Sequence, residues 1–213
     1  MVRALIQQGS PSSEVLAAMM AAAVSDHWLS MLQSPALTRY AEAAARAWES
    51  LPEQLNGGDR YDVVSAMVAA ARDSALAEAG GGGPAIGLAE RALTRLVLER
   101  TAPGPAEGPL RSAADVWREN RGPSPGDLAG SFLAETLRQM ARHFFTRDAA
   151  EFTGSAAIPD VRALRALARS IGEAAAETAE PARPLLNRRG TSGWAEGVRI
   201  AVLAGGARKP PAP

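Results

Sequence analysis

Cysteine is absent from this chain of 213 residues. Its absence excludes disulfides, thiolate zinc sites, iron–sulfur clusters and cysteine nucleophiles. A chain without cysteine also fits a reducing compartment, so we expect a cytoplasmic location. Histidine is scarce as well, since His27 and His143 are the only two. General acid–base chemistry at either one would need a partner group and a cleft, and no sequence pattern supplies them.

Several catalytic motifs are missing too. The chain has no Gly-x-x-x-x-Gly-Lys-Ser/Thr loop for nucleotide phosphates, no His-Glu-x-x-His pair for zinc and no Gly-x-Ser-x-Gly turn for a serine nucleophile. Carboxylate pairs such as Asp59 with Asp62 are expected at helix starts or on solvent-facing surfaces. We therefore predict no catalytic, cofactor-binding or metal-binding residues, and a protein that is not an enzyme is favoured.

Aromatic residues and long hydrophobic runs are also rare. Aromatics make up 5% of the chain, and the longest uncharged apolar stretch is Val15–Ser25. That stretch is far shorter than the roughly 18 residues that a membrane-spanning helix needs, so no membrane association is expected. Alanine, in contrast, occupies 46 positions. This composition favours helices and disfavours a large sheet.

Helix starts are marked by Ser-Pro pairs at 10–11, 34–35 and 124–125, where the hydroxyl can cap the helix and proline fits its first position. The sequence predicts an all-α, single-domain multi-helix bundle of about seven helices, with a short C-terminal element at 193–204 that fits a helix or a strand. The predicted helices cover residues 11–33, 35–51, 60–79, 85–101, 111–121, 125–147 and 159–179.

Four of these helices carry one-sided apolar stripes, which are typical of helices that cover a shared core. The stripe residues are spaced three and four apart and therefore line one face. The predicted core-facing residues are Val64, Met67, Val68, Ala71 and Ala75; Leu88, Ala92, Leu93 and Leu96; Leu133, Leu137, Met140 and Phe144; and Val161, Leu164, Leu167, Ala168 and Ile171.

The helix predicted at 11–33 differs, because its apolar residues cover most of its circumference. Such a helix is either buried on all sides or exposed to a partner. We favour the central helix of the bundle, with Leu16, Met20, Val24 and Met31 pointing into the core. A subunit interface is the alternative.

Proline and glycine clusters suggest the domain limits. Residues 102–110 are rich in both and mark a possible boundary or exposed linker. We expect one helical bundle domain over 1–204, with a possible subdivision near 102–110. The Pro-rich segment 205–213 is predicted to be a disordered tail.

The charges balance overall, with 23 basic and 23 acidic residues, but they are unevenly placed. Arg162, Arg165 and Arg169 share one face of the helix predicted at 159–179, and its acidic residues follow them. This order opposes the helix dipole, which favours acids first and bases last. Arg188 and Arg189 add a second basic cluster towards the C-terminus. These five arginines are the predicted interaction residues, although a simply solvated face remains an alternative for the first three.

Together these features favour a non-enzymatic helical accessory or adaptor subunit that mediates protein–protein contacts in a bacterial-type complex. A protein partner or a homo-oligomer is the expected partner. The second hypothesis is a protein that contacts nucleic acid through its basic C-terminal half, although a net charge of zero disfavours a general nucleic-acid coat. A small-ligand-binding or enzymatic bundle without a known motif is the third.

Overall fold

The described parts of the computed structural model consist of helices joined by turns and bends, without strands in any of them. The structure describes residues 2–10, 12–25, 28–55, 59–77, 83–102, 113–120, 125–149, 153–156 and 158–206. The α-helices are α1 (Val2–Gln7), α2 (Ser12–Ser25), α3 (Trp28–Leu32), α4 (Pro35–Leu55), α5 (Arg60–Leu76), α6 (Pro84–Thr101), α7 (Ala113–Asn120), α8 (Pro125–Ala149), α9 (Val161–Glu177), α10 (Arg183–Arg189) and α11 (Trp194–Gly206). Short 3₁₀ helices, η2 (Glu180–Ala182) and η3 (Gly190–Gly193), flank α10.

The predicted all-α class is confirmed, but the number of helices is higher than predicted. The helices α1 and α10 have no counterpart among the predicted segments, and the ambiguous element at 193–204 is a helix, α11. Both of the missed helices are short, seven residues or fewer. Segments of that length carry too few turns for an apolar stripe to show in the sequence.

Side-chain caps fix the starts of several helices. The Asp59 carboxylate accepts from the Tyr61 backbone N–H at 2.8 Å, and Asp160 accepts from Ala163 N–H at 2.7 Å. The Ser34 hydroxyl accepts from the backbone N–H of Leu37 at 3.3 Å, as its Ser-Pro pair predicts. The caps at the other two Ser-Pro pairs include residues outside the described part of the chain.

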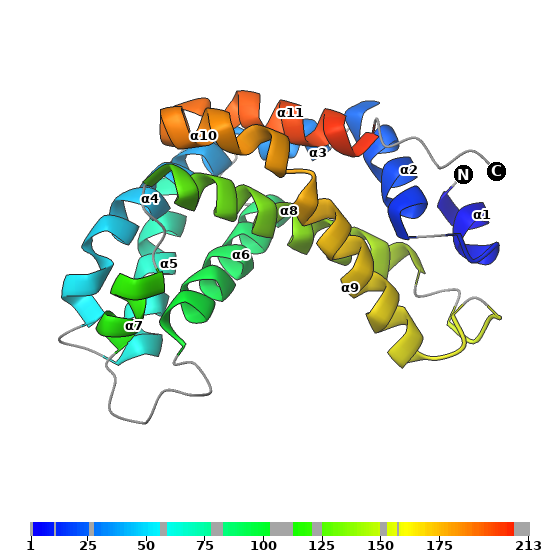
Figure 1. Ribbon diagram of the computed structural model, residues 1–213, viewed down its shortest axis with the longest axis horizontal. Coiled ribbons are helices and arrows are strands. Elements are labelled where there is room, and N and C mark those ends of the chain that lie inside the picture. The colour runs from blue at the N-terminus through cyan, green and yellow to red at the C-terminus, as the bar shows by residue number, and fades with distance from the viewer. Residues whose placement is uncertain are drawn as a thin grey trace.

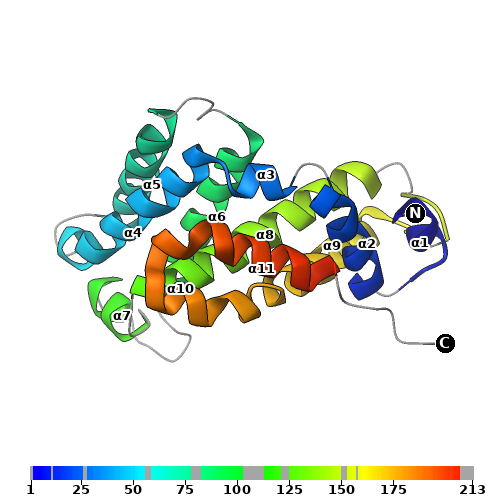
Figure 2. The same cartoon turned by 90° about the horizontal axis from the view of Figure 1, so that it is seen from above.

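Helix α8 is the centre of the fold. It contacts α6, α9, α10 and α4. Figure 1 shows α6 and α9 descending on either side of α8, while α10 and α11 cross above it. Seen from above, α10 and α11 run side by side over α8, with α2 and α1 at one end of the molecule (Figure 2). Polar side chains of α8 reach both neighbours: Arg138 contacts Glu173 of α9, and Glu135 lies near Arg95 of α6.

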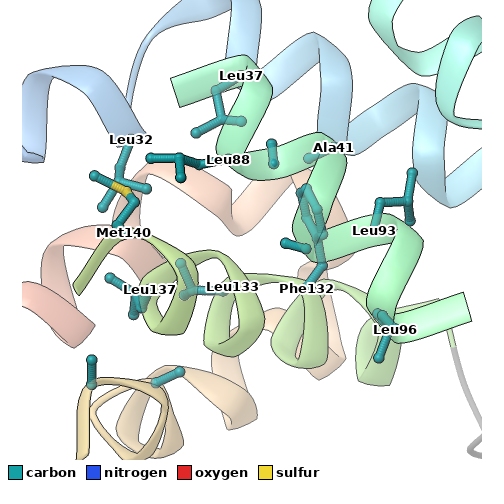
Figure 3. Packing of buried hydrophobic residues seen from close by; sticks show 14 of the residues in the cluster. Leu32, Leu37, Ala41, Leu88, Leu93, Leu96, Phe132, Leu133, Leu137 and Met140 are labelled. Carbon is teal, nitrogen blue, oxygen red and sulfur yellow. The ribbon is translucent and has the colours of Figure 1, made fainter. Parts of the chain in front are cut away.

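The core lies where α3, α4, α6 and α8 meet, and its side chains interdigitate (Figure 3). Most are aliphatic and fully buried, and Phe132 of α8 stacks on Tyr40 of α4 with ring centroids 5.9 Å apart. The residues labelled in Figure 3 are Leu32, Leu37, Ala41, Leu88, Leu93, Leu96, Phe132, Leu133, Leu137 and Met140.

The single long helix predicted at 11–33 is wrong, because the structure has two separate helices, α2 and α3. The central position is wrong as well: α2 packs at one end of the molecule against α9, α11 and α1. Leu16 and Met20 are fully buried as predicted, and Met31 is partly buried. The side chain of Val24 lies outside the described residues. The apolar circumference is explained by contacts with helices on several sides of α2.

The predicted stripes on the other helices match the core with one exception. Val161, assigned to the core-facing stripe of α9, is 52% exposed. It is the first residue of the helix. Leu164, Ala168 and Ile171 are buried as predicted.

The predicted linker at 102–110 lies outside the described residues, apart from Ala102. Helices on both sides of it pack together, because α6 contacts both α7 and α8. The subdivision of the chain stays a prediction. At the C-terminus, α11 continues through Gly206, two residues past the expected limit of the helical region, and Gly205 is buried. The remaining predicted tail, 207–213, lies outside the described residues.

Candidate functional site

The predicted arginine face exists on α9. Arg162, Arg165 and Arg169 are all exposed, and within the described chain none of them has an ion pair. Apart from the N-cap Asp160, whose carboxylate accepts from Ala163 N–H, no acidic residue lies at the start of α9, and Arg162 places a positive side chain in its first turn, where the dipole is also positive. These three guanidiniums are therefore available to a ligand or partner.

The acid of α9 that comes next after these arginines, Glu173, is paired with a residue of another helix. Glu173 lies one turn after Arg169, but its carboxylate accepts from Arg138 of α8 at 2.8 Å. Arg138 in turn contacts Glu135 on its own helix. The close fit of the two helices at Gly172 allows these contacts, since a Cβ atom there would lie 2.6 Å from Cγ of Arg142.

Glu135 of α8 lies near Arg95 of α6 and also contacts Arg138 on its own helix. It is only 3% exposed, and its carboxylate accepts from Gln139 at 2.7 Å and lies 3.6 Å from Nε of Arg95. Arg95 also donates to Glu99 at 2.7 Å. That hydrogen bond raises the pKa of Arg95, and the charge of Glu135 raises it further, while partial burial opposes both. The carboxylates of this region are thus used within a network that spans α6, α8 and α9.

A hollow of about 430 Å³ lies beside this network, between α6 and α8. Among the described residues that line it, four are arginine or histidine and none has a carboxylate. Arg91 and Arg142 have no ion pair within the described residues. The lining residues are Arg91, Gln139, Arg142, His143, Thr146 and Arg147.

Aromatic and backbone contacts hold two of these arginines, Arg142 and Arg147. The Arg147 guanidinium lies 5.1 Å from the centroid of the Phe144 ring, a cation–π distance, and its Nε donates to Asp148 at 2.7 Å. The edge of the same Phe144 ring meets His143 at 5.4 Å. The Arg142 stem lies across the backbone of α9 at Gly172. The hollow thus has a prearranged basic wall along α8.

A second hollow of about 730 Å³ lies on the other side of α6, against α5. Its lining mixes apolar side chains such as Val68 and Leu98 with charged ones, and two acids, Glu90 and Glu99, are among them. Arg91 borders both hollows. The mixture of charges makes this second hollow a weaker candidate for selective recognition of a charged group.

Arg188 and Arg189, the other predicted interaction residues, lie apart from the α9 face. They end α10, which turns back over α8 so that its end lies across the molecule from the start of α9 (Figure 1). Both are exposed, and Arg188 donates to the Pro184 carbonyl at 3.4 Å. The structure therefore divides the five predicted arginines into two separate surfaces.

Sequence reasoning missed the basic hollow. Its arginines come from α6 and α8, and only their placement on facing sides of the two helices brings Arg91 near Arg142 and Arg147. His143 was considered alone, and its position at the hollow depends on the same packing. The other histidine, His27, lies outside the described residues.

Two further findings bear on function. Within the described ranges, no group of three or more histidine and carboxylate side chains is placed to hold a metal ion. In the same part of the chain, no helix is both long enough and apolar enough to cross a bilayer.

Comparisons of the chain with protein-family models, curated proteins and solved structures give no match.

Proposed function

We propose that this protein is a non-enzymatic helical adaptor that docks an acidic segment of a partner protein on the exposed face of α9. The observation that carries the proposal is the set of three exposed guanidiniums, on Arg162, Arg165 and Arg169, without ion pairs in the described chain. Because the chain has no cysteine, we propose that the adaptor works in the reducing cytoplasm.

The position of the arginines supports this proposal. Arg162 lies in the first turn of α9, where the helix dipole makes a positive charge unfavourable in the isolated helix, and Arg165 and Arg169 follow it on the same face. A bound carboxylate would remove that unfavourable interaction and would gain charge-assisted hydrogen bonds, which are the stronger class of hydrogen bond. Arginine is also suited to this role because its planar fork binds a carboxylate through two hydrogen bonds.

An exposed apolar residue beside the arginines favours a protein over a nucleic acid. Val161 is 52% exposed and lies four residues before Arg165, so the two share one side of the helix. An apolar side chain on a partner can cover Val161 while its acidic neighbours meet the arginines. The net charge of zero points the same way, because a phosphate backbone is bound best by a basic surplus.

Two double variants with equal changes of charge test the proposal. One is Arg165→Glu with Arg169→Glu, and the matched control is Arg188→Glu with Arg189→Glu at the end of α10. The probe is a fluorescent synthetic peptide in which acidic residues alternate with leucine, and binding is followed by fluorescence anisotropy at two salt concentrations. A single-stranded oligonucleotide of equal charge is titrated in parallel.

We expect the wild type to bind the peptide more tightly than the oligonucleotide. The α9 variant should lose peptide binding by about tenfold or more, whereas the α10 variant should bind within about twofold of the wild type. Tighter oligonucleotide binding that is lost in the α9 variant would replace the proposal with nucleic-acid contact. Equal losses of peptide affinity in both variants would show that the peptide is held by general charge attraction, and would overturn the proposal.

A further inference from the structure

We propose that the hollow between α6 and α8 binds the phosphate group of a phosphate monoester. Nothing in the proposed docking role of α9 requires this site, because none of its lining residues belongs to α9. The proposal therefore stands on separate residues and adds a second ligand to the same protein.

The donor set of the hollow matches a phosphate dianion. Guanidinium groups from Arg91, Arg142 and Arg147 line the hollow together with the Gln139 amide and the Thr146 hydroxyl. A phosphate monoester has three terminal oxygens that accept several hydrogen bonds each, and arginine binds such oxygens in pairs. A single carboxylate has two oxygens and is satisfied by one arginine, so it would leave most of these donors unused.

The positive charge in the hollow is only partly compensated among the described residues, because Asp148 pairs with Arg147 while Arg91 and Arg142 have no ion pair there. The carboxylates that could neutralise it are engaged: Glu90 lies 3.4 Å from Arg72, and Glu99 and Glu135 are held by Arg95 and Arg138. Asp148 meets Arg147 through Nε, which leaves the two terminal nitrogens of that guanidinium for another acceptor. Two guanidiniums brought together without ion-pair partners in the described chain, as Arg91 and Arg142 are, are typical of a site that binds an anion.

Packing prearranges the basic side chains, which lowers the entropy lost on binding. The Arg142 stem is confined between α8 and the backbone of α9, because the helices approach so closely at Gly172 that a Cβ atom there would meet Cγ and Cδ of Arg142 at 2.6 and 2.7 Å. Arg147 rests on the ring of Phe144. The stem of Arg142 and the guanidinium of Arg147 are therefore held in place before a ligand arrives.

The size of the hollow indicates an ester and not the free ion alone. Small-molecule sites typically have volumes of about 300–1,000 Å³, and this hollow has about 430 Å³. A phosphate group fills a small part of that space, so a short organic group attached to it also fits. The phosphate monoester can come from a small metabolite-sized molecule or from a phosphorylated side chain, since the recognised group is the same.

Isothermal titration calorimetry on the full chain tests the site with four probes. They are inorganic phosphate, glycerol 3-phosphate, a short phosphoserine peptide and the same peptide with glutamate in place of phosphoserine. The variant Arg91→Ala with Arg142→Ala removes two of the donors. Arg165→Ala with Arg169→Ala removes equal charge from α9 and is the matched control. A third variant, Thr146→Glu, places a carboxylate in the hollow at an exposed position and keeps all three arginines.

We expect a phosphate monoester to bind the wild type with 1:1 stoichiometry, and the glutamate peptide to bind at least about tenfold more weakly. The variant at Arg91 and Arg142 should lose about tenfold or more in affinity, and so should Thr146→Glu, while the α9 control should stay within about twofold. Tighter binding of glycerol 3-phosphate assigns the site to a small molecule, and tighter binding of the phosphoserine peptide assigns it to a modified protein.

Three results would overturn the proposal. The first is no phosphate-dependent heat with any of the probes. The second is equal affinity for the phosphoserine and glutamate peptides. The third is an equal loss in the α9 control, which would show general attraction to positive charge. The α9 peptide experiment has its own variants, so either proposal can fail while the other stands.

Discussion

The indole N–H of Trp194 donates a hydrogen bond of 2.8 Å to the backbone carbonyl of Leu32, and both partners are buried. This bond joins the first residue of α11 to the last residue of α3, which are 162 positions apart. A second bond runs the other way, from the Gln33 amide to the Ala195 carbonyl at 2.7 Å. The end of α3 leaves backbone carbonyls without helical partners, and α11 satisfies one of them.

Replacing Trp194 with phenylalanine should lower the free energy of unfolding by about 2–4 kcal/mol. The change removes the hydrogen bond, leaves the buried Leu32 carbonyl without that donor and opens a small cavity. Thermal and urea denaturation of the variant measure the loss. Gln33→Ala, which removes the exposed reciprocal bond, is the control and should cost less than about 1 kcal/mol. A similar cost for both variants would contradict the role assigned to the buried bond.

The contact between α2 and α11 leads to a second prediction. Met20 is fully buried, and a Cβ atom at Gly205 would lie 2.8 Å from its Cε and 3.3 Å from its Cβ. Met20→Ala should cost about 2–5 kcal/mol through the cavity it creates. Gly205→Ala should cost about 1–3 kcal/mol, because the added methyl group overpacks the contact.

Combining these two substitutions gives a sharper test. The alanine methyl at position 205 enters space that Met20 leaves in the Met20→Ala variant. The double variant should therefore lose less unfolding free energy than the two single variants lose in sum, by about 1 kcal/mol or more. Urea denaturation resolves a coupling of this size. Simple additivity would show that the two helices do not meet at this pair.

Tyr40 should tolerate the loss of its hydroxyl group. The side chain is fully buried, its oxygen has no hydrogen-bond partner among the described residues, and burial raises its pKa so that the phenol stays neutral. Tyr40→Phe keeps the stacking on Phe132 and removes a buried polar atom, so we expect a gain of about 1 kcal/mol in unfolding free energy. A loss above about 1 kcal/mol in chemical denaturation would argue against this arrangement.

Tyr61→Phe is the matched control for that substitution. Tyr61 is 59% exposed, and its hydroxyl accepts from Arg60 at 2.9 Å. Solvent replaces that bond when the hydroxyl is removed, so the variant should stay within about 0.5 kcal/mol of the wild type. The contrast between the two tyrosines isolates the effect of burial from that of the chemical change.

Local sequence patterns were sufficient for most of the helices, because capping and apolar spacing act within a few turns. The capping oxygen of Ser34 lies three residues from Leu37, and the stripe on α8 repeats every three or four residues. The division of 11–33 into α2 and α3 has no comparable local signal. Trp28 starts α3 and packs on Phe144 with ring centroids 5.4 Å apart, a contact with a distant helix that the local sequence does not encode.

The candidate site shows the same limit. The face formed by Arg162, Arg165 and Arg169 lies on one helix, so its spacing alone predicted it. The basic hollow joins Arg91 of α6 with Arg142 of α8, which are far apart in the sequence. Their proximity results from the packing of α6 on α8 and from the close approach of α9 at Gly172. Only a tertiary arrangement can bring such residues together.

The last prediction concerns Glu135, the buried acid that joins α6 and α8. Its substitution by glutamine removes the charge that faces Arg95 and Arg138, so two partly buried guanidiniums lose their shared partner. We expect a loss of about 2–3 kcal/mol in unfolding free energy, somewhat below the 3–5 kcal/mol typical of a fully buried pair, because both arginines still reach solvent. Glu173→Gln is the control, since that carboxylate is about half exposed and should contribute less than about 1 kcal/mol. Urea denaturation at low and high salt separates the two carboxylates: salt should reduce the small effect at Glu173 and leave the effect at Glu135 nearly unchanged. Equal costs with equal salt sensitivity would show that Glu135 is as well solvated as Glu173 and that the network does not hold the helices together.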